Sequence, residues 1–232
     1  GRYDAAIRRY QKAINAIPDS AEAHWNLALT QLATGNYADG WNEYEWRSLL
    51  PGFAMEKMDR PQWQGEDLNG RTLLVHAEQG LGDTLQFARY LKLLQDMDGD
   101  VVFACADRIR KILQPVAGNI RIVPLKKHPD HDLQTPLMSL PRLFNDALPF
   151  EPTGGIYLQP NQSRTDAWRE KLETPPGRRI GIAWQGSSAY QHDGRRSIPL
   201  LNFEPLARRE DLQLISLQQG EGAGQIEEMP WR

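Results

Sequence analysis

Residues 71–91 read RTLLVHAEQGLGDTLQFARYL, an apolar run that passes through a glycine-containing loop into a helical pattern. The run at 71–76 is short and bounded by turn residues, which predicts a buried strand. From Thr84 to Leu94 the apolar residues recur at the spacing of one helix face. The loop at 77–83 is therefore expected at the carboxyl end of a strand.

The residues that follow continue this alternation. The pattern predicts a strand at 101–106, a helix at 107–116 and a strand at 120–123. Strand, helix, strand, helix, strand at this spacing indicates a parallel, right-handed, doubly wound sheet. Further short strands are predicted at 136–140 and 155–158, around the segment 140–148.

A second α/β unit is predicted near the end of the chain. Its expected parts are a strand at 179–184, a loop at 185–197, a helix at 200–209 and a strand at 212–217. These parts make one βαβ unit, whereas a full doubly wound domain has about five or six strands. We therefore expect the second domain to be truncated in this chain.

Residues 1–50 show a 34-residue period. The matching pairs are Gly1 and Gly35, Tyr3 and Tyr37, Ala6 and Gly40, and Tyr10 and Tyr44. This period resembles the tetratricopeptide repeat. The small residues Ala6 and Gly40 are predicted where two helices approach closely. The repeats are either a scaffold or a peptide-binding groove.

The repeat helices have predicted boundaries and a predicted contact surface. Pro18 ends a helix because it lacks an N–H, and Asp19 or Ser20 can cap the next one. So short an array needs another surface to pack on, since about three repeats are usually required. The aromatic cluster at 41–46 is the predicted seam with the next domain, and Trp63 a predicted anchor on it.

Composition excludes several classes of protein. The net charge is −3 and no block of basic residues stands out, so a nucleic-acid partner is not expected. A single cysteine excludes an internal disulfide framework and fits a reducing, cytoplasmic location. No apolar run approaches the ~20 residues of a membrane span. The chain opens inside a helical pattern, without an initiator methionine, so we expect a fragment of a longer protein.

The loop at 77–83 has the wrong pattern for a dinucleotide. Gly80 and Gly82 are followed by Leu85 where the third glycine of G-x-G-x-x-G belongs. Asp83 also opposes a phosphate at the helix entrance. A nicotinamide-dependent enzyme stays open on this evidence. So do two roles for Asp83, as an N-cap or as a general base that accepts a proton from a substrate hydroxyl.

The loop at 185–197 has the opposite character. Gly186 lets the backbone approach a ligand, and Ser187 and Ser188 offer hydroxyl and N–H donors. Arg195 and Arg196 present guanidinium donors that suit phosphate. The loop therefore predicts a phosphate or diphosphate site, and a solvated basic loop is the alternative.

Two acidic and histidine-containing clusters have residue types that metals use. Asp96, Asp98 and Asp100 lack the glycine of a calcium loop and are interpreted as a polar turn. The segment 128–132, HPDHD, is interpreted as a loop. We expect no metal and no cofactor beyond a co-substrate.

Three segments carry a resemblance to a known family. They are WQGEDLNGRTLLVHAEQGLGDTLQFARY at 63–90, DLQTPLMSLP at 132–141, and RIGIAWQGSSAYQHDGRRSIPLLNFEPLA leading into LISLQ at 179–219. They resemble bacterial proteins in which tetratricopeptide repeats precede a GT-B glycosyltransferase module. That module is similar to the heptosyltransferase-like glycosyltransferase family 9 and, more distantly, to O-linked N-acetylglucosamine transferases.

The resemblance implies an α/β fold with an N-terminal all-α repeat segment and two Rossmann-like domains facing across a cleft. The implied parts are a partial repeat array at 1–50, a linker at 51–70, an acceptor-side domain at 71–160, a linker at 161–177, and the truncated start of a nucleotide-sugar-binding domain at 178–232. This chain has no match to the family's later D-T-x-x-x-H-like segment near the donor.

The resemblance also implies roles for named residues. Asp83 would be the catalytic base, and the acceptor would lie near Gln79, Gly80 and Gly82. The donor diphosphate would lie near the donors of the second loop, which are Gly186, Ser187, Ser188, Arg195 and Arg196.

The resulting hypothesis is an inverting glycosyltransferase that moves a sugar from a nucleotide donor to a hydroxyl of a protein or glycan. We expect the fragment to be inactive alone. The alternative is a non-catalytic, repeat-containing interaction module with a degenerate α/β domain, which would bind a protein partner through the repeats.

Overall fold

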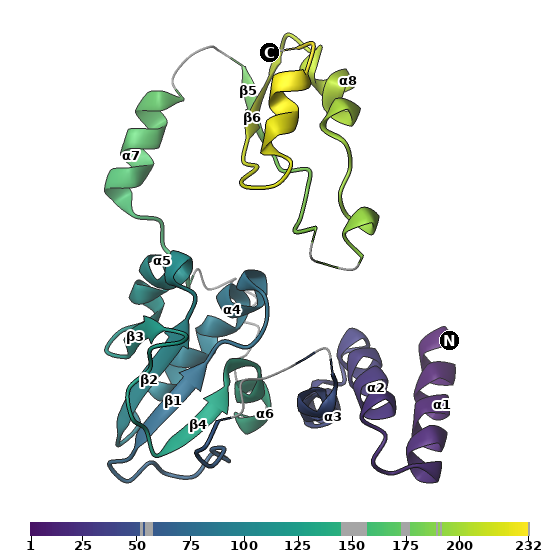
Figure 1. Ribbon diagram of the computed structural model, residues 1–232, viewed down its shortest axis with the longest axis vertical. Coiled ribbons are helices and arrows are strands. Elements are labelled where there is room, and N and C mark those ends of the chain that lie inside the picture. Colours follow the sequence, from purple (N-terminus) through teal and green to yellow (C-terminus); the bar gives the residue numbers. More distant parts are fainter. Residues whose placement is uncertain are drawn as a thin grey trace. The chain divides into compact units, whose positions relative to one another are not determined.

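The computed structural model describes residues 1–51, 53, 58–144, 157–172, 177–188, 190 and 192–231. The chain divides into two units, Gly1–Pro160 and Asn161–Arg232 (Figure 1). The first holds the repeat helices and a parallel sheet, and the second holds a smaller parallel sheet. The structure is thus mixed α/β with a helical N-terminal part, as predicted.

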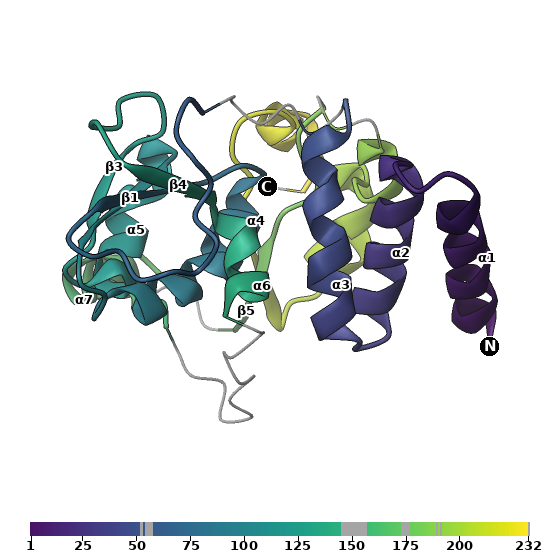
Figure 2. The same cartoon turned by 90° about the horizontal axis from the view of Figure 1, so that it is seen from below.

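The repeat segment is a row of antiparallel helices that lie side by side in both views (Figures 1 and 2). They are α1 (Arg2–Ala16), α2 (Ala21–Ala33) and α3 (Tyr37–Tyr44), continued by the 3₁₀ helix η1 (Glu45–Leu49). The helix α1 ends before Pro18, and the Ser20 hydroxyl caps α2 by accepting the Ala23 N–H at 3.4 Å. Both predictions are confirmed.

Gly40 is the point of closest approach between α2 and α3. A Cβ on Gly40 would lie 2.8 Å from Cγ and Cδ2 of Leu32 on the neighbouring helix. A real Cβ does not tolerate that separation, so the close packing requires glycine here. This confirms the prediction drawn from the small residue in the repeat.

The first sheet has four parallel strands in the order β3-β2-β1-β4. The strands are β1 (Thr72–His76), β2 (Asp100–Cys105), β3 (Arg121–Pro124) and β4 (Leu133–Pro136). Between them run α4 (Leu81–Phe87), η2 (Ala88–Leu94) and α5 (Asp107–Ala117). The first three strands and their helices were predicted to within three residues, and the helix predicted at 84–94 is α4 continued by the 3₁₀ helix η2.

Alternate residues of the strands pack on opposite faces of this sheet. Leu73, Val75 and Phe103 join the main core with residues of η2 and α5. Leu74, Val102 and Ala104 form a separate cluster on the other face. Burial on both faces explains why the strands read as continuous apolar runs.

The predicted strand at 136–140 is wrong. The strand β4 ends at Pro136, and the chain turns into η3 (Leu137–Ser139) and α6 (Leu140–Leu143), where Pro141 occupies the first turn. Proline is tolerated there because a first-turn N–H has no helical partner. Of the predicted strand at 155–158, residues 155 and 156 lie outside the described residues, and 157 and 158 are not in a strand.

The segment before β1 is attached to the sheet. Trp63 is fully buried, its N–H donates to the Gln134 carbonyl at 2.8 Å, and its indole donates to the Glu66 carbonyl at 2.7 Å. A parallel bridge pairs Gln62 with Gln134. Trp63 is therefore the anchor that the sequence predicted.

The second unit contains a pair of parallel strands, β5 (Arg178–Ile182) and β6 (Leu212–Ser216). The other elements are α7 (Gln162–Lys171), η4 (Asp193–Arg195), η5 (Leu200–Phe203), α8 (Glu204–Ala207) and η6 (Ala223–Glu228). Ile182, Trp184 and Leu200 form its small core. The range 161–177, expected as a linker, contains the helix α7, and the helix expected at 200–209 is the shorter pair η5 and α8.

Candidate functional site

At the carboxyl edge of the first sheet, the place where a doubly wound sheet usually forms a ligand-binding crevice lies between β1 and β4; we call it the crevice position. The chain leaves β1 toward β2 on one side, while β4 lies on the other, so the direction of winding reverses between them. Ligands of doubly wound sheets bind at such a point, beyond the carboxyl ends of the strands. His76 and Pro136 are register partners at this edge, so the segments that follow them flank the same position.

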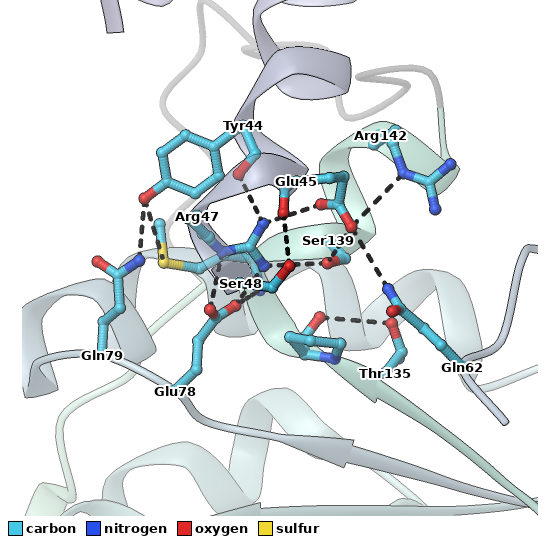
Figure 3. A network of polar contacts seen from close by, with 12 residues as sticks. Tyr44, Glu45, Arg47, Ser48, Gln62, Glu78, Gln79, Thr135, Ser139 and Arg142 are labelled. Atoms are coloured by element: carbon cyan, nitrogen blue, oxygen red, sulfur yellow. Dashed lines mark hydrogen bonds and ion pairs between the residues drawn. The ribbon is translucent and has the colours of Figure 1, made fainter. Parts of the chain in front are cut away.

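In this chain a side chain of the repeat segment occupies that position (Figure 3). Arg47 of η1 is 1% exposed and makes a bidentate pair with Glu78, at 2.8 Å from Nε to Oε2 and 2.7 Å from Nη2 to Oε1. The Glu78 side chain is itself only 2% exposed. Nη2 of Arg47 also donates to the Ser139 hydroxyl at 3.0 Å. The pair thus joins η1, the loop after β1 and the segment after β4.

Glu45 completes the charge balance of this cluster. Its Oε1 accepts from Arg47 Nη1 at 2.9 Å, and its Oε2 accepts from the Ser139 hydroxyl at 3.0 Å and from Gln62 Nε2 at 3.3 Å (Figure 3). Two carboxylates therefore surround one guanidinium. Burial alone would lower the pKa of Arg47, but the hydrogen bonds and charges of Glu78 and Glu45 outweigh it and raise that pKa further above its usual range.

Gln79, a predicted acceptor-binding residue, holds the repeat segment in place. Its Nε2 donates to the Tyr44 hydroxyl at 3.0 Å, and that hydroxyl lies 3.9 Å from Met138 Sδ (Figure 3). Burial raises the pKa of Tyr44, and the Gln79 hydrogen bond partly opposes it. Trp41 also packs edge-on against Phe87 of α4.

The predicted seam is therefore confirmed for Trp41 and Tyr44. Trp46 departs from it, because its ring stacks on His24 at 3.8 Å inside the repeat.

Asp83 makes a capping contact at the start of α4. Its Oδ2 accepts the Gly80 N–H at 3.1 Å, and Gly80 is the N-cap while Asp83 is the third helical residue. Asp83 is thus not the N-cap itself, although its charge lies in the first turn, where the helix dipole favours it. Its Oδ1 has no hydrogen-bond partner among the described residues. Gly82 is exposed, and a Cβ there would meet nothing within 4 Å.

His76 is the last residue of β1 and is buried. Its Nε2 lies 3.0 Å from Gln134 Oε1. Burial lowers the pKa of His76, and the hydrogen bond to Gln134 only partly opposes this. The folded structure thus disfavours the charged form of His76.

The loop after β5 directs main-chain N–H groups onto side-chain oxygens. The N–H groups of Trp184 and Gln185 both donate to Gln218 Oε1 at 3.0 Å. The Gly186 N–H donates to the Ser197 hydroxyl at 2.9 Å, and the Ser188 N–H donates to Glu221 Oε2 at 3.0 Å. A set of backbone donors therefore faces oxygen acceptors, one of which is a carboxylate.

Carboxylates also hold the arginine-containing half of this loop. Asp193 accepts from Arg196 Nε at 2.8 Å and from the Ser197 hydroxyl at 2.7 Å. The Arg196 and Ser197 hydrogen bonds lower the pKa of Asp193. A Cβ on Gly186 would lie 2.4 Å from both Arg196 Nη2 and Asp193 Oδ1, so the glycine is needed for this approach.

The remaining predicted donors, Ser187 and Arg195, are exposed. Gly186, Ser188 and Arg196 thus contact acceptors within the unit, and Ser188 and Arg196 are exposed as well.

No group of three or more His, Cys, Asp or Glu side chains in the described ranges is placed to hold a metal ion. Asp96 and Asp98 lie in the turn before β2, and Asp100 pairs with Arg121 at 3.4 Å. Asp132 accepts the Thr72 N–H at 2.8 Å and so fixes the start of β1. Asp100 and Asp132 therefore have structural contacts of their own.

The sequence analysis missed Arg47 and Glu78. Their side chains come from segments that no local pattern connects. Taken alone, each charged residue would be expected at the protein surface. The available signal was the position of Arg47, directly after the aromatic cluster that predicted a buried seam.

Comparisons with known proteins support the repeat and add one distant relative. A family model described as "TPR repeat" matches residues 1–35. The chain is 27% identical to "Protein FlbA" of Caulobacter vibrioides, over 95% of this chain and 41% of that protein. The chain therefore spans about two fifths of the length of this relative. No solved structure matches.

No helix in the described residues is long and apolar enough to cross a membrane.

Proposed function

We propose that this chain is part of an inverting glycosyltransferase of the GT-B type that moves a sugar from a nucleotide donor to a hydroxyl group of a protein or glycan. The observation that carries the proposal is the contrast between two loops at equivalent places. The first turn of α4, after β1, offers the Asp83 carboxylate, whose Oδ1 has no partner among the described residues. The loop after β5 offers N–H groups that now bind side-chain oxygens, together with two exposed guanidinium groups. Transfer from a sugar diphosphate needs both chemistries.

In this proposal Asp83 is the base. The acceptor hydroxyl gives its proton to Asp83 Oδ1 while its oxygen forms a bond to the anomeric carbon of the sugar. The bond between that carbon and the diphosphate breaks at the same time, and the nucleotide diphosphate leaves with the electron pair, which inverts the anomeric centre. The capping bond to Gly80 uses Oδ2 and keeps the carboxylate oriented. Capping and proton transfer are therefore compatible.

The loop after β5 is the proposed place of the diphosphate. Its N–H groups already bind oxygen atoms, and the Glu221 carboxylate takes one of them at 3.0 Å. A phosphate oxygen is the same kind of acceptor. The exposed guanidinium of Arg195 and the partly exposed one of Arg196 would neutralise the charge that develops on the leaving group. No metal is part of the proposal.

The proposed setting is cytoplasmic, in a bacterium. Cys105 is a buried free thiol, which suits a reducing compartment.

A calorimetric titration of the whole gene product with UDP, GDP and ADP sugars tests the proposal. We expect one nucleotide class to bind, and Arg195→Gln to weaken its binding by at least about tenfold, because a charge-assisted hydrogen bond is lost. Arg209→Gln is the matched control, since Arg209 is also exposed in this unit but pairs with Asp211 at 2.8 Å. Failure of every nucleotide sugar to bind would overturn the proposal.

The second candidate is a non-catalytic interaction module. The observation that favours it is Arg47, which fills the crevice position of the first sheet from the repeat segment. The tetratricopeptide match also fits a protein partner. This candidate predicts a protein that binds no nucleotide sugar in the same titration.

A further inference from the structure

Two consecutive side chains tie the loop between β1 and α4 to the repeat segment (Figure 3). Glu78 pairs with Arg47, and its Oε1 also accepts the Met138 N–H at 3.2 Å. Gln79 Nε2 donates to the Tyr44 hydroxyl at 3.0 Å. Two neighbouring residues of this loop are therefore fixed by partners that lie outside their own strand and helix.

The next residue of the loop, Gly80, connects these contacts to Asp83. The Gly80 N–H donates to Asp83 Oδ2 at 3.1 Å, and the Gly80 carbonyl accepts from the N–H and the hydroxyl of Thr84, each at 3.0 Å. Thr84 is buried, so these bonds fix Gly80 against α4. The direction of the Asp83 carboxylate therefore depends on where Gly80 lies, and the adjoining Gln79 limits where Gly80 can lie.

Tyr44 holds its hydroxyl at a defined place in this arrangement. The residue is 5% exposed, and its ring packs on Trp25 and Trp41 with centroids 4.8 Å and 5.2 Å away. Burial is the main cause that raises the pKa of Tyr44, and the negative charges of Glu78 and Asp83 raise it further. The Asp83 carboxylate thus lies within electrostatic range of Tyr44.

We propose that Tyr44 is a positioning residue, through which the repeat segment holds the loop after β1 and sets the direction of the Asp83 carboxylate. Asp83 is half-buried and uses Oδ2 to accept from Gly80, so a shift of Gly80 would turn Oδ1 as well. A base must lie within hydrogen-bond reach of the proton that it accepts, and a small misplacement slows the reaction. The catalytic consequence rests on the proposed function, whereas the contact between repeat and loop does not.

Hydrogen exchange of the whole gene product, read by mass spectrometry on peptides that cover 77–83, tests the positioning. Tyr44→Phe keeps the buried ring and removes the acceptor of the Gln79 hydrogen bond. We expect these peptides to exchange about three- to tenfold faster, because a hydrogen bond that limits local opening is lost.

Tyr10→Phe is the matched control for the exchange experiment. Tyr10 is the equivalent of Tyr44 in the preceding repeat and is also partly buried. Its variant should leave exchange at 77–83 unchanged. Exchange at the parent rate in Tyr44→Phe, or the same increase in Tyr10→Phe, would overturn the inference.

Sugar transfer by the same proteins gives the second readout. Tyr44→Phe should lower kcat about three- to tenfold and leave KM for donor and acceptor within about twofold, because the base is misdirected while the binding groups remain. The double variant Tyr44→Phe with Gln79→Met should be no slower than Gln79→Met alone, since both changes remove one hydrogen bond.

Two results of the transfer assay would overturn the inference. They are an unchanged kcat in Tyr44→Phe, and effects of Tyr44→Phe and Gln79→Met that multiply in the double variant. If the parent itself transfers no sugar, the proposed function fails, and the exchange experiment alone decides whether Tyr44 positions the loop.

Discussion

The loops after β1 and β5 occupy equivalent places in two βαβ patterns, yet they differ in what covers them. Beyond β1, Arg47 and Glu78 form a buried pair whose side chains are 1% and 2% exposed. Beyond β5, the Gly186 and Ser188 N–H groups bind side-chain oxygens near the surface. The same position in the topology is thus closed in one unit and accessible in the other.

The edge of a parallel sheet therefore does not define a binding site by itself. In the first unit the repeat segment supplies the charge that fills the crevice position, and in the proposed function Asp83, in the first turn of α4, is the reactive group. In the second unit the acceptors are carboxylates, an amide and a hydroxyl, and in the proposed function a diphosphate would replace some of them.

Removal of the buried guanidinium should have the largest effect. Arg47→Met leaves Glu78 buried and unpaired, so we expect the free energy of unfolding to fall by about 3–5 kcal/mol in a denaturant titration. The double variant Arg47→Met with Glu78→Leu should recover most of this loss. Arg121→Met, which breaks an exposed pair with Asp100, is the control and should cost less than about 1 kcal/mol. If Arg47→Met and Arg121→Met lower the free energy of unfolding by the same amount, Arg47 does not act as a buried structural charge.

The packing of the repeat gives the next largest effect. Gly40→Ala should lower the free energy of unfolding by about 1–3 kcal/mol, because its Cβ would overlap Leu32. Gly82→Ala is the matched control, since open space surrounds that position in α4. If Gly82 faces the acceptor, this control variant should keep its stability and lose transfer activity. A Gly40 variant as stable as the parent would contradict the packing.

The buried histidine predicts a dependence of stability on pH. The pKa of His76 is lowered in the folded chain, so the unfolded chain binds a proton first as the pH falls through about 6.5. The free energy of unfolding should therefore decrease below that pH. His76→Gln should remove the part of this decrease that His76 causes. Denaturant titrations at about pH 7.5 and about pH 5.5 measure the free energy of unfolding on both sides of the transition. If the parent and the His76→Gln variant lose the same free energy of unfolding between these pH values, groups other than His76 cause the loss.

The smallest structural change is expected at the exposed edge of the second unit. Glu221→Gln removes the negative charge that faces the Ser188 N–H, and Glu221 is exposed, so the thermal midpoint should not move measurably. Affinity for a nucleotide diphosphate should rise a few-fold, because a competing carboxylate has lost its charge. A lower affinity would mean that Glu221 binds the ligand and does not occupy the place of a phosphate.

The sequence predicted those parts of the fold that depend on local pattern. The apolar runs of β1, β2 and β3 indicated buried parallel strands, and the 34-residue period indicated the repeat. The strand β4 was missed because its residues, LQTP, show no apolar run. Its place in the sheet comes from pairing with β1 and with the segment around Trp63.

The candidate sites were predictable only in part. The chemistry of the loop at 185–197 could be read from its residue types, whereas its internal acceptors Gln218 and Glu221 come from a distant segment. Arg47 and Glu78 are 31 residues apart in the chain and meet only through packing of the repeat on the sheet. The aromatic cluster before Arg47 indicated a buried seam, but the sequence did not show which distant residue would pair with this arginine.

The most direct measurement is sugar transfer by the whole gene product and by its Asp83→Asn variant. Asparagine retains a side-chain oxygen that can accept the Gly80 N–H, so the cap is kept while the base is lost. We expect the variant to bind the nucleotide sugar with unchanged affinity and to transfer the sugar at least about a hundredfold more slowly. Transfer at the parent rate by the Asp83→Asn variant would contradict it.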